Sequence, residues 1–326
     1  MVAFTLRRIA ISIPILIASS FVVFLLGTAA GDPLDPLLGR NPPIPQATID
    51  AERVRLHLDQ PVLERYWNWL VGLFSGDFGP SVKQNLDIGS EIFARFGITM
   101  RLIAFAMLIA LVLAVVVGVV SAVKQYSVVD YSATFLGFLF LSMPAFWFAI
   151  LLKQGGIAFN NTVGEQVVYT IGDASVPPPT DTFARFADIA GHIVLPTIAL
   201  ALISYAAWSR FQRASMLEVM NSDYVRLARS KGLSRRRVMV KHALRTALIP
   251  LVTVTALDLA AIISGAVVTE TVFQWRGMGD FLLESIRTED VYALQAWLLL
   301  TAIVVIGFNL IADLLYAVLD PRIRYA

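Results

Sequence analysis

Residues 102–123 read LIAFAMLIALVLAVVVGVVSAV, a run of 22 residues without a charged side chain. A helix of about 20 apolar residues crosses the hydrocarbon core of a bilayer while satisfying its backbone hydrogen bonds internally. The whole chain has the same character, because 57% of its 326 residues are hydrophobic and 15% are charged. An ordinary soluble domain carries about 25% charged residues. The run therefore predicts a membrane-spanning helix, and the composition predicts several more.

Five further apolar stretches predict an all-α integral membrane protein with six transmembrane helices. The predicted spans are 9–31, 102–123, 131–152, 189–209, 246–269 and 291–319. Asp258 interrupts the fifth and Asp313 the last. The first span follows Arg7 and Arg8, as a signal peptide would, but it is longer than the apolar region of about 7–15 residues that signal peptides contain. A retained helix is therefore predicted.

The distribution of basic residues predicts the orientation of the chain. If the N-terminus is cytoplasmic, 15 of the 26 lysines and arginines fall in short segments on the inner side, where they weigh most on topology. Both termini are therefore predicted to be cytoplasmic. The chain then divides into a tail with the first span (1–31), an extracytoplasmic helical excursion (32–97), a core of five spans (98–319) and a cytoplasmic tail (320–326).

The excursion is predicted to hold two short helices, with Thr48 as a cap for the first and Pro61 at the start of the second. Two interpretations of the second helix stay open: a helix at the membrane interface, or a packing face for the ends of the spans. Its apolar and aromatic residues are Tyr66, Trp67, Trp69, Leu70, Leu73 and Phe74. A second loop, 153–188, contains Pro177-Pro178-Pro179 and is predicted to be irregular.

The loop 210–245, between the fourth and fifth spans, has a net charge of +8. Positive-inside topology and contact with lipid phosphates account for this charge. Nucleic acid is not a predicted partner, because the charges flank membrane spans and no recognised nucleic-acid-binding module is present.

Within this loop, Asn221-Ser222-Asp223 predicts the start of a short helix over 224–231, and Gly232 predicts its end. Asp223 lies at the positive end of the helix dipole and Lys231 at the negative end. The spacing places one face of this helix toward the cytoplasm as a small apolar surface that a groove in another protein would receive. Its residues are Tyr224, Leu227, Ala228 and Lys231.

The stretch 223–233, DYVRLARSKGL, followed by His242 to Arg245 and by Leu248-Ile249-Pro250, resembles the coupling loop of binding-protein-dependent ABC importers. The distance from Gly232 to Pro250 resembles that of the dipeptide, oligopeptide and nickel permease branch. Arg226 and Leu227 stand where the wider family has Glu-Ala, which is a departure. The residues that this resemblance assigns to ATPase coupling are Asp223, Tyr224, Arg226, Leu227, Ala228, Lys231, Gly232 and Leu233.

Further matching stretches extend the resemblance over nearly the whole chain and indicate a permease of the B-subunit kind. They are 76–79, 142–147, 195–196, 269–273, 277–279 and 309–322. The resemblance implies a type I ABC importer permease in the plasma membrane, paired with a second homologous permease subunit. It also implies two cytoplasmic ATPase subunits, or one fused ATPase, and an extracytoplasmic solute-binding protein. Peptides are the favoured solutes, with nickel chelates and glutathione as alternatives.

The sequence predicts no catalytic, cofactor or metal site in this chain. It has no cysteine and no phosphate-binding Gly-x-x-x-x-Gly-Lys-Ser/Thr loop, so ATP and Mg are expected on partner subunits. A channel or an intramembrane enzyme is the rival class, with Ser264 as a nucleophile, but no Gly-x-Ser-x-Gly motif supports it. Small residues at 260, 261, 264 and 265 indicate close helix packing instead.

Asp258, Pro144 and Trp147 are the candidate pathway-lining residues. An ionisable group in the middle of a span normally faces a cavity or a partner. For Asp258, two roles stay open: contact with a substrate amine or a pathway water, or a structural hydrogen bond or ion pair within the bundle. Pro144 and Pro250 are expected to kink their helices, and analogy with the family places such kinks along the translocation path.

Overall fold

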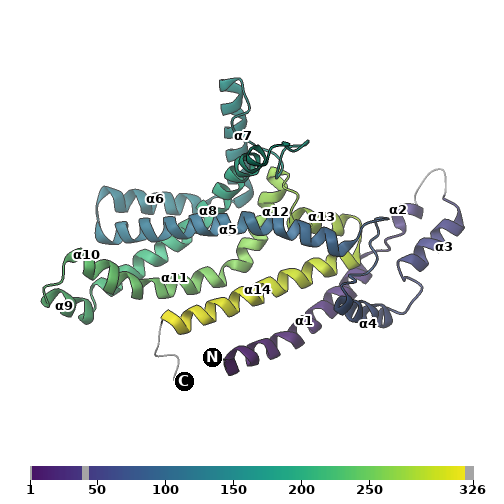
Figure 1. The fold of residues 1–326 in the computed structure, drawn as a ribbon, viewed down its shortest axis with the longest axis horizontal. Coiled ribbons are helices and arrows are strands. Elements are labelled where there is room, and N and C mark those ends of the chain that lie inside the picture. The colour runs from purple at the N-terminus through teal and green to yellow at the C-terminus, as the bar shows by residue number, and fades with distance from the viewer. Residues whose placement is uncertain (1, 39–43, 320–326) are drawn as a thin grey trace. The chain divides into compact units, whose positions relative to one another are not determined.

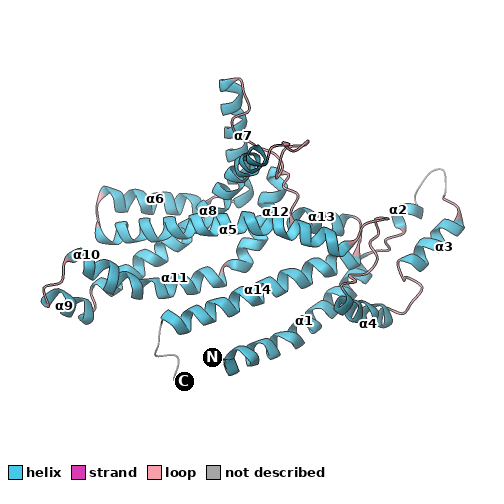
Figure 2. Ribbon diagram, in the orientation of Figure 1, coloured by secondary structure: helices cyan, strands magenta, loops and turns pink. Residues whose placement is uncertain are grey.

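The computed structural model describes residues 2–38 and 44–319, and in these ranges the chain forms helices and loops without any strand (Figures 1 and 2). The helices divide between two compact units. One unit holds Met100–Trp275 with the chain from Gly307 onward, and the other holds Val2–Thr99 with Arg276–Ile306. Two long helices, α5 (Ile88–Val123) and α14 (Val291–Leu319), therefore contribute to both.

Among the described residues, five helical segments are long and apolar enough to cross a membrane, or six if one bent pair counts as a span. Besides α5 and α14 they are α1 (Val2–Ala30), α8 (Thr182–Met220) and the segment Arg235–Leu257. The bent pair is α6 (Val128–Ser142) with α7 (Ala145–Val163). The prediction of an all-α membrane protein is confirmed.

The predicted third span is broken rather than kinked. Its two halves, α6 and α7, meet at an angle of 106° on either side of Met143-Pro144. Proline lacks an N–H and forces the preceding residue toward extended backbone, and Met143 indeed has φ −83° and ψ 131°. Because α7 continues to Val163 and α8 begins at Thr182, only 164–181 of the loop predicted to be irregular lacks helix.

The predicted fifth span, 246–269, falls on two helices rather than one. A π-helical turn, η2 (Val238–Leu244), leads into α11 (Arg245–Leu257), and α12 (Leu259–Phe273) follows after Asp258. Pro250 lies inside α11, which runs on past it. The interruption of the span thus falls at Asp258.

The first unit is organised around α8, which contacts α6, α7, α11 and α12. Helix α5 lies close to α8 at Gly118. A Cβ atom at this position would lie 2.8 Å from the Ser209 carbonyl oxygen and 2.8 Å from Cβ of Gln212. The absence of a side chain at Gly118 therefore allows the two helices to lie this close.

We expect Gly118→Ala to lower the stability of the protein by about 1–3 kcal/mol, because the added methyl group would force α5 and α8 apart. Gly97→Ala is the matched control, since it lies in the same helix and a Cβ atom there would have no neighbour within 4 Å. That change should be neutral or slightly stabilising, because alanine favours helix over glycine. Thermal unfolding of the detergent-solubilised protein measures both, and equal melting temperatures for the two variants would contradict the close contact.

The second unit contains α1, the first part of α5, the start of α14 and several short helices. The short elements are α2 (Asp35–Leu38), α3 (Gln46–Arg55), α4 (Val62–Gly72), the 3-10 turn η1 (Leu73–Ser75) and α13 (Met278–Arg287). Helix α4 follows Pro61 as predicted. Helix α3 begins after Pro45, so Thr48 lies inside it and does not cap it.

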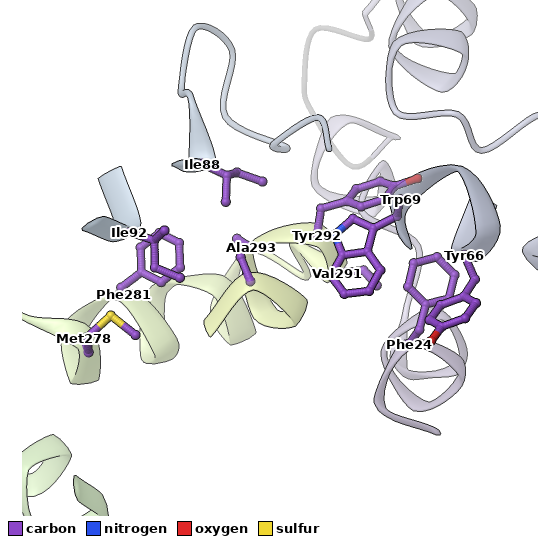
Figure 3. Packing of buried hydrophobic residues seen from close by; sticks show 11 residues of the cluster. Phe24, Tyr66, Trp69, Ile88, Ile92, Met278, Phe281, Val291, Tyr292 and Ala293 are labelled. Carbon is purple, nitrogen blue, oxygen red and sulfur yellow. The ribbon is translucent and has the colours of Figure 1, made fainter. Parts of the chain in front are cut away.

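The core of the second unit joins α1, α4, α5, α13 and α14 (Figure 3). Its buried members are Phe24, Tyr66, Trp69, Ile88, Ile92, Met278, Phe281, Val291, Tyr292, Ala293 and Ala296. Hydrogen bonds to Asp290 also stabilise this unit: its carboxylate accepts from the Ser81 hydroxyl (2.6 Å) and from the Val82 N–H (2.9 Å). The segment around Ser81 and Val82 is therefore held against the start of α14.

Candidate functional site

The helix predicted in the 210–245 loop is present as α9 (Asp223–Ser230). Ser222 occupies the N-cap position, but its hydroxyl donates to the Val219 carbonyl oxygen (2.6 Å) and does not cap α9. Asp223 instead pairs with Arg226 one turn later. At the other end Gly232 has φ +76°, a left-handed conformation that glycine adopts without a steric penalty, and its N–H donates to the Arg229 carbonyl oxygen (3.0 Å).

One face of α9 is buried in the first unit. Val225 and Ala228 belong to a small core formed with α5, α8, η2 and α11. Its buried members are Ala122, Met216, Val225, Ala228, Val238, Ala243 and Ala247, and Leu233 packs against them. The prediction that Ala228 belongs to the exposed face is wrong, because the tertiary packing buries it.

The exposed apolar side chains of α9 are Tyr224, 43% exposed, and Leu227, 56% exposed. They lie three residues apart, and the exposed Lys231 follows one turn after Leu227. We call these three residues the coupling surface. Because Val225 and Ala228 hold α9 by an adjacent face, the coupling surface is presented on a fixed helix rather than on a loose loop.

An ion pair that the sequence did not predict lies close to this segment in the fold. Arg213 near the end of α8 donates from Nε and Nη2 to the two carboxylate oxygens of Asp130 in α6, at 2.7 and 2.8 Å. The Ser121 hydroxyl and the Tyr126 N–H (3.0 Å) also donate to Asp130, which is buried. The α5–α6 connection and α9 lie at the same end of the first unit (Figure 1).

In the sequence, Arg213 stands out only as one of the basic residues of the loop, and no role was predicted for Asp130. The available signal was weak: an acidic residue at the start of an apolar helix, and an arginine just beyond the end of another predicted span. Opposite charges at the same membrane boundary are candidates for pairing, but 83 residues separate this pair along the chain.

The candidate pathway residues lie on different elements. Asp258, between α11 and α12, accepts a hydrogen bond from Nε1 of the buried Trp208 in α8 (2.8 Å). This bond agrees with the structural alternative for Asp258 and occupies one of its two carboxylate oxygens. Pro144 lies at the α6–α7 break, and the partly exposed Trp147 lies in the first turn of α7.

The described residues contain no group of three or more His, Asp or Glu side chains that could hold a metal ion. His57 follows α3, His192 stacks on Tyr169 within the first unit, and His242 lies in η2. The side chains of Ser264 and Asp313, and those of the small residues at 260, 261 and 265, lie outside the described residues.

Several helices long and apolar enough to cross a membrane, with a short helix in the segment between two of them, define a class of protein: a multi-pass membrane component. The chain belongs to the family described as binding-protein-dependent transport system inner membrane component, whose model matches residues 111–325. The N-terminal model of the same kind of membrane component matches residues 1–103. The chain is therefore a multi-pass permease component of an ABC transporter complex and not an enzyme.

Curated relatives match over the full length of the chain. The oligopeptide transport system permease protein OppB of Mycobacterium tuberculosis (strain H37Rv) is 39% identical, with 99% of each chain covered. The oligopeptide permease AppB of Bacillus subtilis (strain 168) is 36% identical, with 100% of each chain covered. The dipeptide permease DppB of Escherichia coli (strain K12) is also 36% identical, covering 100% of this chain and 99% of its own.

Among solved structures, an inward-facing form of the MetNI methionine ABC transporter matches with a TM-score of 0.53. The match covers 70% of this chain and 96% of that chain, at 15% sequence identity. At this identity the likeness shows the fold alone, and it confirms the ABC transporter permease architecture.

Proposed function

We propose that this chain is a permease subunit of a peptide importer, forming half of a translocation pathway with a second homologous permease. The coupling surface on α9 is the observation that carries the proposal. An exposed tyrosine and leucine, on a helix held in place by its buried residues Val225 and Ala228, suit a groove in a cytoplasmic ATPase. The names of the full-length relatives, oligopeptide and dipeptide permeases, support peptides as the solute.

The proposed complex contains two ATPase subunits, or one fused ATPase, that bind ATP and Mg, and an extracytoplasmic solute-binding protein. Both termini and the 210–245 loop lie on the cytoplasmic side of the plasma membrane, supported by the concentration of basic residues there. ATP-driven closure of the ATPases moves α9, and the movement changes which side of the membrane the pathway opens to.

Leu227→Asp tests the proposal, because it places a charge on the coupling surface without touching the core below α9. We expect recovery of the ATPases from mild detergent extracts to fall at least about tenfold, the equivalent of about 1.4 kcal/mol of binding free energy. ATP-dependent accumulation of a labelled tripeptide in proteoliposomes that contain the whole complex should be lost in parallel.

Arg229→Asp is the matched control, since it lies on the same helix, is exposed, and causes a larger change of charge on a different face. It should retain ATPase recovery and peptide uptake. Equal loss in both variants, or no loss in Leu227→Asp, would contradict the assigned surface. Accumulation of glutathione or a nickel chelate in place of peptides would overturn the proposed solute and leave the importer class standing.

A further inference from the structure

The second unit carries an apolar surface that its own core does not use. Helix α4 and the following turn η1 expose large apolar side chains three or four residues apart. They are Leu63, Trp67, Val71 and Phe74, and we call them the α4 stripe. Trp67 is 63% exposed and Phe74 is 92% exposed. Single exposed apolar residues need no explanation, but a continuous row along a helix marks an interaction surface.

The depth of α4 follows from its contacts with α1. The Tyr66 hydroxyl donates to the Ile17 carbonyl oxygen (3.0 Å) and lies 2.9 Å from the Ser20 hydroxyl. Ser20 is ten residues before the end of α1 at Ala30, or about 15 Å along the helix axis. Half the hydrocarbon thickness of a bilayer is also about 15 Å. The contact therefore lies within the part of α1 that is predicted to span the membrane, and not beyond its end.

The ring contacts place the body of α4 on the same part of α1. Tyr66 packs on Phe21 and Phe24, with ring centroids 5.0 and 5.6 Å apart, and Trp69 continues this packing (Figure 3). Phe24 is six residues from the end of α1, about 9 Å along the axis. A helix held beside this part of α1 lies at the level of the membrane rather than in the aqueous space beyond it.

The surroundings of the stripe indicate lipid rather than water. The neighbouring surface of α1 is itself apolar and exposed, with Ile17, Val22, Leu25 and Leu26 among its exposed side chains. Glu64, Asn68 and Ser75 are exposed on another side of the same segment. A helix with an apolar and a polar exposed side lies parallel to the membrane plane, with its apolar side in the acyl chains.

Pro61 at the N-cap position of α4 has no N–H group, so one of the four donors that a helix start leaves unpaired is absent. The buried Arg65 finds a partner in the ring of Phe24, 5.6 Å from its guanidinium carbon. We propose that α4 is an interfacial helix, parallel to the membrane plane, whose stripe of Leu63, Trp67, Val71 and Phe74 is immersed in lipid acyl chains. The leaflet is the one on the side of the α1–α5 connection.

Spin labelling tests this placement with little preparation, because the chain has no cysteine to remove. Single cysteines are introduced at Trp67, Val71 and Phe74 and, on the polar side, at Glu64, Asn68 and Ser75. The whole complex is labelled in nanodiscs of phosphatidylcholine and phosphatidylglycerol, and the complex with the native chain gives the background from partner subunits. Leu26 in α1 serves as the lipid reference and Ala51 in α3 as the aqueous reference.

At the stripe positions we expect collisions with oxygen to exceed those with a water-soluble nickel chelate, as at Leu26. At the polar positions the ratio should be reversed, as at Ala51. Low accessibility to both reagents at the stripe would show that a partner protein covers it, and high accessibility to nickel would show that it faces water. Either result overturns the proposal.

Discussion

Val225→Asp is expected to detach α9 from the first unit and to abolish the proposed coupling to the ATPases. Val225 is fully buried in the core with Met216 and Ala243, and that core offers an aspartate no partner. Burial of an unpaired carboxylate combined with the loss of the valine methyl groups costs on the order of 3 kcal/mol or more. Because each 1.4 kcal/mol is a factor of ten, the detached state of the loop should become about a hundredfold more populated.

Trypsin measures this population directly, since the 210–245 loop contains ten lysines and arginines. When detachment and reattachment are fast relative to cleavage, the rate of cleavage in the loop should rise in proportion to the population of the detached state. Leu227→Asp introduces the same side chain two residues later at an exposed position, so its loop should remain as resistant as the native one. If the Val225→Asp loop were equally resistant, the buried core would not be what holds α9.

The position of α9 could be predicted because its ends are encoded locally. Asp223 and Gly232 mark a start and a stop within a single short stretch, and the helix found, Asp223–Ser230, lies within one residue of the prediction at each end. The buried face could not be predicted in the same way. Ala228 is small enough for either face, and only contact with residues from α8, η2 and α11 decides that it is covered.

The third span likewise has a feature that depends on contacts with residues distant in the sequence. Pro144 predicted a kink, because proline disfavours helix at the residue before it. The size of the bend, 106°, depends on how α7 packs against α8 and α12, which are distant in sequence. For α4 and the turn after it, the sequence does not decide between a role at the membrane interface and a role in packing. The structure shows a face for each role: Tyr66 and Trp69 are buried in the core, whereas Trp67 and Phe74 are exposed.

Asp130→Ala is expected to destabilise the first unit by about 3 kcal/mol, because it leaves the guanidinium of Arg213 without its bidentate partner. The value lies at the low end for a broken buried ion pair, since the Arg213 side chain is 29% exposed and gains some hydration. Ser121 and the Tyr126 N–H lose their acceptor as well. The α5–α6 connection and the end of α8, from which α9 follows, should then loosen together.

The double variant Asp130→Ala with Arg213→Met separates the ion pair from the packing around it. Replacing both charges removes the uncompensated guanidinium, so most of the lost stability should return even though the ion pair is gone. Thermal unfolding of the purified protein compares the two variants, and tripeptide uptake by the whole complex reports whether the proposed transport survives each change. If the double variant were as unstable as Asp130→Ala, the carboxylate would be holding the connection through Ser121 and Tyr126 rather than by balancing the charge of Arg213.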